Sequence, residues 1–175
     1  MAAEGHVQRI VAVVGADVAP SLWMRSEPPV AYVAVAGADG DVAGDVLDRA
    51  EAVGAELARC GAVLVCGGLG GVMEAACRGA REAGGVTVGI LPGEDRTAAN
   101  RWVSVAIATG LGELRNGLVV RCADSVIAIS GGYGTLSEVA LALKSGKPVV
   151  GLGSWEIDGV RAAGDPVAAV ALALG

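Results

Sequence analysis

The sequence predicts an α/β fold, a doubly wound parallel sheet with helices on both faces. From Pro29 onward, short runs rich in Val, Ile, Leu and Ala alternate with helical patterns, which is the order of βαβ units. The apolar runs are nearly continuous, as expected of parallel strands that are buried on both faces. The chain has 175 residues, 53% of them hydrophobic and 18% charged, which suits a domain with a substantial core.

Local signals mark where the elements begin and end. Gly84 and Gly85 stop a helix, Pro92 ends a strand, and Asp165 with Pro166 starts the last helix. Apolar residues recur at helical spacing between 42 and 57. In chain order we expect strand 30–36, helix 42–57, strand 62–66, helix 71–83, strand 86–91, polar loop 94–101, strand 103–108, helix 111–122, strand 125–129, helix 135–144, strand 148–152, short strand 160–162 and helix 166–174.

Residues 1–29 are expected to be an extension, either an added edge strand or a loose arm, ahead of a single domain at 30–175. The stretch from Val11 to Asp17 repeats the stretch from Val33 to Asp39, with six identities in seven. Only the second copy leads directly into an amphipathic helix, so we take it as the first strand of the sheet. The apolar run before Asp17 is too short for the core of a signal peptide.

Charge and cysteine content argue against several classes of function. The net charge is −6, whereas general nucleic-acid binding relies on an excess of Lys and Arg. No apolar run approaches the ~20 residues that span a membrane. Cys60, Cys66, Cys77 and Cys122 form no CxxC pair and the one histidine is His6, so we expect no metal site. Reduced thiols in the cytoplasm are the expectation.

Two glycine-rich stretches each follow an apolar strand, open a helix and carry a glutamate at the same offset. Glycine lets a ligand approach the main chain, and the free N–H groups of a helix N-terminus bind an anion without lysine. Such turns lie at the carboxyl ends of parallel strands, where ligands bind. Thr135 either caps its helix or contacts phosphate. The predicted phosphate- or ligand-binding residues here are Gly67, Gly68, Gly70, Gly71, Gly131, Gly132, Gly134 and Thr135.

Other polar residues have two open interpretations each. Glu138 lies one turn into its helix, where it either caps the positive helix end or stabilises an oxocarbenium-like centre at an N-glycosidic carbon. Arg115, next to Asn116 in a leucine-rich helix, is either an exposed arginine or a bidentate phosphate ligand. Pro92 and Gly93 follow a buried strand and form either a solvated turn or the rim of a pocket.

Two familiar nucleotide motifs do not occur. The first strand is followed by Gly37-Ala38-Asp39-Gly40 rather than GxGxxG, and no GxxxxGK[ST] sequence is present. Binding of NAD and hydrolysis by a P-loop are therefore not expected.

Several motifs in order resemble those of a known family. The stretch from Gly131 to Glu138 resembles the PGGxGTxxE motif of the LOG family, long misnamed lysine decarboxylases, and the stretch from Gly67 to Glu74 resembles its first glycine-rich motif. Residues 79–85, 89–93 and 109–116 are similar to a short subgroup that includes molybdenum cofactor carrier proteins. The resemblance covers about residues 30–160. It implies a Rossmann-like fold and a homo-oligomer.

The resemblance implies two alternative functions for a small-molecule phosphate ligand. LOG enzymes cleave cytokinin riboside 5′-monophosphates without a cofactor, using an Arg and a Glu that correspond to Arg115 and Glu138. The chain would then be a nucleoside 5′-monophosphate phosphoribohydrolase, with Asn116 among its ligand-binding residues. Alternatively it is a non-enzymatic carrier or sensor of the molybdenum cofactor or a nucleotide. The sequence departs from the enzymes at Ser130, where the motif has Pro, and at Asn116, where they have Lys.

Overall fold

The structure is a computed structural model that describes residues 30–175, and the expectations for residues 1–29 lie outside these described residues. Seven parallel strands form one sheet in the order β4-β3-β2-β1-β5-β6-β7. The predicted Rossmann-like α/β fold is thereby confirmed. The strands are β1 (Tyr32–Gly37), β2 (Val63–Cys66), β3 (Thr87–Leu91), β4 (Val105–Ala108), β5 (Ser125–Ile129), β6 (Val149–Leu152) and β7 (Val160–Ala163).

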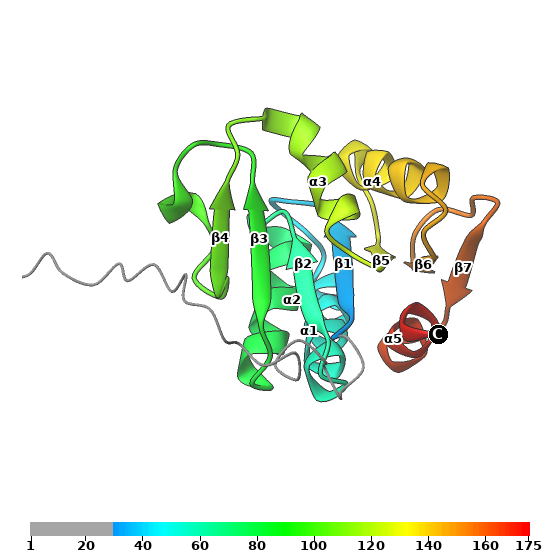
Figure 1. The fold of residues 1–175 in the computed structure, drawn as a ribbon. Helices are drawn as coiled ribbons and strands as arrows, with labels where there is room; N and C mark the ends of the chain where they lie inside the picture. Colours follow the sequence, from blue (N-terminus) through cyan, green and yellow to red (C-terminus); the bar gives the residue numbers. More distant parts are fainter. Residues whose placement is uncertain (1–29) are drawn as a thin grey trace, which may run out of the picture.

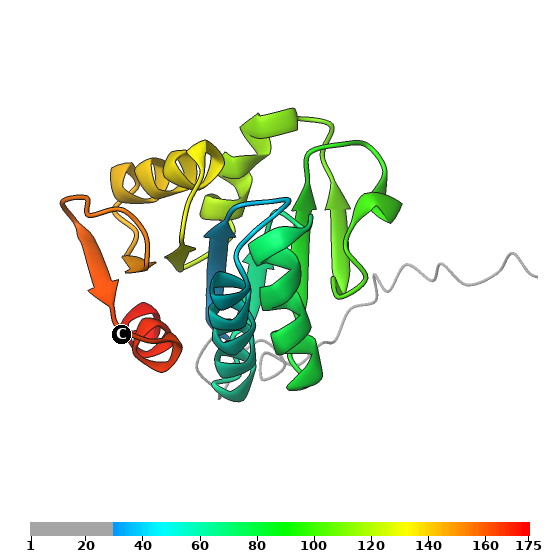
Figure 2. The same ribbon diagram turned by 180° about the vertical axis from the view of Figure 1, so that it is seen from behind.

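Helices cover both faces of the sheet, as Figures 1 and 2 show from opposite sides. Val33 and Val35 of β1 belong to the core that faces α1, α2 and α5, whereas Ala34 and Ala36 belong to the core that faces α3 and α4. This alternation follows from the two-residue repeat of a strand. The helices are α1 (Gly44–Arg59), α2 (Gly71–Glu82), α3 (Asn116–Arg121), α4 (Tyr133–Lys144) and α5 (Pro166–Leu174).

Three helices depart from the expected bounds, and the first of them, α1, lies two residues further along the chain than expected. The segment predicted as one helix at 111–122 is a 3-10 turn, η3 (Gly112–Arg115), followed by the short α3. Helix α4 begins two residues earlier than expected, because Gly132 has extended backbone and takes the N-cap position. The polar loop at 94–101 contains a further 3-10 turn, η2 (Arg96–Ala98), whose N-cap is Asp95.

The chain changes direction across the sheet between β1 and β5. Strands β1 to β4 are added in one direction, and β5 then returns to pair with the other side of β1. The segments that leave β1 and β5 lead to helices on opposite faces of the sheet. In such sheets ligands bind in the crevice that this divergence leaves at the carboxyl ends of the strands. Across residues 30–175, no helix combines the length and apolar character that crossing a membrane requires.

Candidate functional site

A cavity of about 440 Å³ lies at the crevice between β1 and β5. Its volume falls within the range of small-molecule sites, about 300–1,000 Å³. The turns after β1, β2, β3 and β5 line it, together with η3 and the start of α3. The cavity brings together seven of the residues expected from the sequence, which are Pro92, Arg115, Asn116, Gly132, Gly134, Thr135 and Glu138.

The open N-terminus of α4 forms part of this cavity. The first hydrogen bond within the helix runs from Leu136 N to Gly132 O, at 3.0 Å. The N–H groups of Tyr133, Gly134 and Thr135 precede this bond and have no partner along the helix. A Cβ placed on Gly132 would meet no atom within 4 Å, so a ligand can come close to the main chain. The 12-residue helix thus offers an anion site.

Two buried polar atoms in the cavity wall have no hydrogen-bond partner. Among residues 30–175 three buried side-chain polar atoms are unpaired, and two of them are Thr135 Oγ1 and Arg115 Nε. Thr135 is 2% exposed. Leaving a buried polar group unpaired costs about 1–3 kcal/mol, so both atoms are candidate contacts for a ligand. Thr135 does not cap α4, because the N-cap is Gly132.

Arg115 is buried, contrary to the interpretation of an exposed helical arginine. Leu111, Leu114 and Leu118 are exposed instead. The guanidinium lies against Gly67, where an added Cβ would be 2.4 Å from both Nη1 and Nη2. The first glycine-rich turn thus leaves space for the Arg115 side chain.

Glu138 faces Arg115 across a buried gap. Its Oε1 lies 3.8 Å from Arg115 Nη1, which is an ion-pair distance but too long for a hydrogen bond. Burial raises the pKa of the Glu138 carboxyl to about 7, although the charge of Arg115 acts in the opposite direction. The carboxyl therefore exchanges a proton near neutral pH, as a general acid or base would.

Asn116 joins the start of α3 to the second glycine-rich turn. Its Nδ2 donates to Ser137 Oγ at 3.0 Å, and Ser137 Oγ donates to Gly134 O at 2.7 Å. This chain of hydrogen bonds fixes the position of the turn at the opening of α4. Asn116 adds no charge, so Arg115 is the one cationic side chain among the residues that line the cavity.

The other predicted glycines do not line the cavity, and all of them except Gly93 pack against protein atoms. Gly68 and Gly71 have positive φ, 75° and 57°, and Gly70 lies against Asp39. Gly131 lies under the ring of Trp155, and Gly93 accepts hydrogen bonds through its carbonyl oxygen. Ligand binding by Gly67, Gly68, Gly70, Gly71, Gly93 and Gly131 stays a prediction.

A sequence model of the SLOG cluster4 family matches residues 30–171. The chain belongs to this family. The predicted LOG-like membership is therefore confirmed, and so is the similarity to molybdenum cofactor carrier proteins.

Solved structures similar to this SLOG cluster4 chain include two proteins connected with the molybdenum cofactor. The molybdenum cofactor binding protein from Rippkaea orientalis is 37% identical, with 83% of this chain and 96% of that chain covered and a TM-score of 0.79. The molybdenum cofactor carrier protein of Chlamydomonas reinhardtii is 36% identical, with 82% and 95% covered and a TM-score of 0.75.

A sequence relative is an uncharacterized protein of Archaeoglobus fulgidus. It is 48% identical over 100 residues, which is 57% of this chain and 66% of that protein. The match spans just under two thirds of that relative.

Several lining residues were not predicted from the sequence of this family member. They include Gly37, Ala38 and Asp39, the turn after β1, as well as Leu69 and Glu113. The turn after β1 lacks a recognised phosphate motif. Its place in the site depends on β5 pairing with β1, and a prediction of that strand order would have indicated it.

Ser130 differs from the family motif in conformation as well as in residue type. Its φ is 54°, in the left-handed region. The proline of the LOG motif has its φ fixed near −65°, so it could not adopt this backbone. The substitution therefore changes the path of the turn as well as its stiffness.

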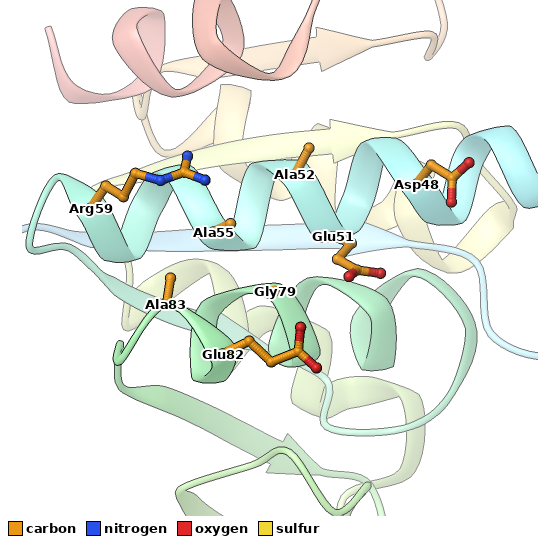
Figure 3. A pocket seen from close by; sticks show the side chains of 8 residues that line it. All are labelled: Asp48, Glu51, Ala52, Ala55, Arg59, Gly79, Glu82 and Ala83. Carbon is orange, nitrogen blue, oxygen red and sulfur yellow. The ribbon is translucent and has the colours of Figure 1, made fainter.

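A second hollow, of about 610 Å³, lies between α1 and α2, away from the carboxyl ends of the strands (Figure 3). It forms where Gly54 and Gly79 let the two helices touch through their backbones, since a Cβ on either would lie 1.9 Å from a carbonyl oxygen. Three carboxylates, Asp48, Glu51 and Glu82, line the hollow against the single cation Arg59. Unlike the cavity at β1 and β5, this hollow includes no helix N-terminus and none of the unpaired buried side-chain atoms found among residues 30–175.

Proposed function

We propose that this chain binds a phosphate-bearing pterin of the molybdenum cofactor type and carries it without cleaving it. The observation behind this proposal is the open N-terminus of α4, which shares one cavity with the unpaired Thr135 Oγ1 and Arg115 Nε. The choice of ligand is supported by the Rippkaea and Chlamydomonas proteins, whose names state that they bind or carry this cofactor.

Different residues of the cavity would bind the phosphate and the heterocycle of the ligand. The phosphate accepts hydrogen bonds from the main-chain N–H groups at Gly134 and Thr135 and from the Thr135 hydroxyl. Arg115 donates from Nε and a terminal nitrogen in the bidentate geometry that suits phosphate. Asp39 and Glu113 also line the cavity and supply acceptors for N–H groups of a heterocycle.

Binding is tested with the cofactor itself. Molybdenum cofactor released anaerobically from a holoenzyme is mixed with the purified chain, and the complex is separated from free cofactor by gel filtration. We expect molybdenum and pterin to elute with the protein in equal amounts. Retention should be lost in Thr135→Val and kept in Gly44→Ala, an open surface position at the start of α1. No retention by the wild-type chain would refute the proposal.

Hydrolysis of a nucleoside 5′-monophosphate is the second candidate, and the buried pair of Arg115 and Glu138 favours it. In that reaction ionised Glu138 would stabilise the positive charge that develops at the ribose carbon while water attacks it, and Arg115 would hold the phosphate. The test is release of adenine from AMP. Release that Glu138→Gln abolishes would establish hydrolysis, and no release over many enzyme equivalents would leave the carrier function.

An exposed apolar face lies beside the cavity, on η3, α3 and α4. We propose that a second copy of the chain covers it in a homo-oligomer. Leu114 is 80% exposed and Tyr133 is 92% exposed, although both are large. Sedimentation should give a dimer or larger assembly, and Leu114→Lys should shift it toward monomer. A wild-type monomer at all concentrations would contradict this. The exposed apolar residues here are Leu111, Leu114, Leu118, Tyr133 and Leu141.

We also propose a cytoplasmic location. The four cysteines include no CxxC pair and show no disulfide framework in their spacing, which suits a reducing compartment. Cell fractionation with an antibody against the chain tests this. Recovery with the secreted proteins would contradict it.

A further inference from the structure

Two buried thiols lie directly beneath the first glycine-rich turn. Cys66 is the last residue of β2 and Cys77 belongs to α2. Both are fully buried free thiols, and their Sγ atoms are 3.5 Å apart. Cys66 Sγ also accepts a hydrogen bond from Gly68 N at 3.3 Å. Neither thiol has a part in the proposed binding of a ligand.

We propose that hydrogen peroxide converts Cys66 and Cys77 into a disulfide, and that this bond displaces the Gly67–Gly68 turn from Arg115. The two sulfur atoms must approach from 3.5 Å to about 2.05 Å, the length of a disulfide. The strand end and the helix already hold the two sulfur atoms in contact. Peroxide is small enough to reach a buried thiol when the glycine-rich turn opens briefly.

The surroundings assign different roles to the two sulfurs. Cys66 Sγ accepts the N–H of Gly68 and lies in hydrogen-bond contact with Cys77 Sγ, where either thiol could donate. The contacts with Cys77 and Gly68 lower the pKa of the Cys66 thiol, so we take Cys66 as the nucleophile. The same hydrogen bond and burial raise the pKa of the Cys77 thiol.

The reaction has two balanced steps. The Cys66 thiolate attacks one peroxide oxygen and becomes a sulfenic acid, releasing hydroxide, which takes up the proton that Cys66 lost. The Cys77 sulfur then attacks the Cys66 sulfur, and the hydroxyl leaves as water with the Cys77 proton. One peroxide and two thiols thus give one disulfide and two waters. A thiol reductant reverses the change.

We expect the disulfide to affect the cavity through Gly67 and Gly68, the two residues that follow Cys66. Movement of Cys66 Sγ toward Cys77 withdraws the acceptor of the Gly68 N–H. Gly67 lies between Cys66 and Gly68 in the chain. The Arg115 guanidinium packs so closely against Gly67 that a Cβ there would clash with it. A shift of Gly67 therefore moves the guanidinium. The consequence for ligand binding rests on the proposed function.

The chemical step is tested on the wild-type chain. The exposed Cys60 and Cys122 are first alkylated in the native protein, and peroxide is then added. After denaturation, a protease that cuts after glutamate separates the two buried cysteines at Glu74. We expect a peptide with Cys66 disulfide-linked to a peptide with Cys77, and reversal by dithiothreitol. Recovery of both as free thiols, or as sulfinic acids without linkage, would overturn the proposal.

The displacement is tested by NMR of the same oxidised sample. The side-chain Nε–H of Arg115 and the amide N–H of Gly68 should shift on oxidation and return on reduction. A disulfide that leaves the Arg115 signal unchanged would overturn the coupling. Cys77→Ala should abolish both the linkage and the shift.

Affinity for the molybdenum cofactor should fall about tenfold on oxidation, the loss expected when a charge-assisted hydrogen bond is misplaced. An unchanged affinity, with the Arg115 signal shifted, would overturn the effect on binding. If the reduced chain fails to bind the cofactor at all, the proposed function fails and the thiol chemistry still stands on its own result.

Discussion

Arg115 rests on the Cα of Gly67, so closely that a Cβ there would lie 2.4 Å from both terminal nitrogens of the guanidinium. The two glycine-rich turns therefore have different surroundings, although their sequences are similar. The second turn is open at Gly132, where an added Cβ would meet no atom within 4 Å. The first holds the arginine that faces the cavity of the second.

Gly67→Ala should weaken ligand binding without touching the ligand. The added methyl displaces the Arg115 guanidinium, so we expect affinity for the molybdenum cofactor to fall about tenfold or more. Crowding in a packed region should also lower the free energy of unfolding by about 1–3 kcal/mol. Gly44→Ala, at an open position, should change neither quantity. Unaltered affinity in Gly67→Ala would contradict the role given to this contact.

Thr135→Val should separate stability from binding. Its hydroxyl is buried and unpaired, so replacing it with a methyl group should leave the free energy of unfolding unchanged or raise it by about 1 kcal/mol. Binding should weaken, because the hydroxyl donor is lost. Thr87→Val is the matched control, since Thr87 Oγ1 donates to Trp102 O at 2.7 Å and its loss should destabilise the chain. Urea titration compares the two, and equal destabilisation would contradict the assignment.

Glu138 should make the chain less stable as pH rises toward neutral. The pKa of this carboxyl is about 7 in the folded chain against an ordinary value of 4.5, so the folded state holds the proton more tightly. The contribution of protonated Glu138 to the free energy of unfolding is therefore fully present below pH ~4.5. It is lost as the pH rises to ~7, a change of about 3 kcal/mol at most. Thermal unfolding at several pH values should show a flatter profile in Glu138→Gln. A fall of the same size in that variant would contradict this.

The same titration distinguishes the two candidate functions. A phosphate dianion binds more tightly beside a protonated Glu138 than beside an ionised one, so carrier affinity should fall as pH rises through about 7. A hydrolase that uses the ionised carboxylate should instead gain activity over that range. Calorimetric titration with the cofactor and an adenine-release assay give the two profiles.

Ser130→Gly should stabilise the chain. Ser130 has a φ of 54°, where a residue with a Cβ is strained by roughly 1–2 kcal/mol and glycine is not. Ser130→Pro, which restores the family motif, should destabilise it, because proline cannot adopt that φ. Chemical denaturation of both variants measures the difference. A stabilising proline would mean that the turn takes the path of the LOG motif after all.

The strands were predictable from the sequence to within about two residues. Buried parallel strands are short apolar runs, and residues such as Gly84, Gly85 and Pro92 mark where the chain turns. Arg115, Glu138 and Thr135 were also predicted to belong to one site, and the cavity brings them together. These signals are local in the chain, so one sequence is enough to show them.

The features of the site that were not predicted depend on contacts between segments that are distant in the chain. The turn at Ala38 and Asp39 lines the cavity because β5 pairs with β1, which no local pattern indicates. The leucine-rich segment at 111–122 was predicted as one helix, with Arg115 either exposed or bound to phosphate. The structure has a 3-10 turn and a short helix there instead, with Arg115 and Asn116 buried and Leu114 exposed. The contact between Arg115 and Gly67 could not be predicted either, because it also joins segments that are distant in the chain.

The most direct test is a nitrogen–proton correlation spectrum of the isotopically labelled chain, recorded anaerobically with and without the molybdenum cofactor. We predict that the largest shifts occur at the main-chain N–H groups of Gly134 and Thr135 and at the Arg115 Nε–H, with the cofactor in slow or intermediate exchange. No shifts, or shifts concentrated at Gly79 and Ala83 in the hollow between α1 and α2, would contradict phosphate binding at the N-terminus of α4.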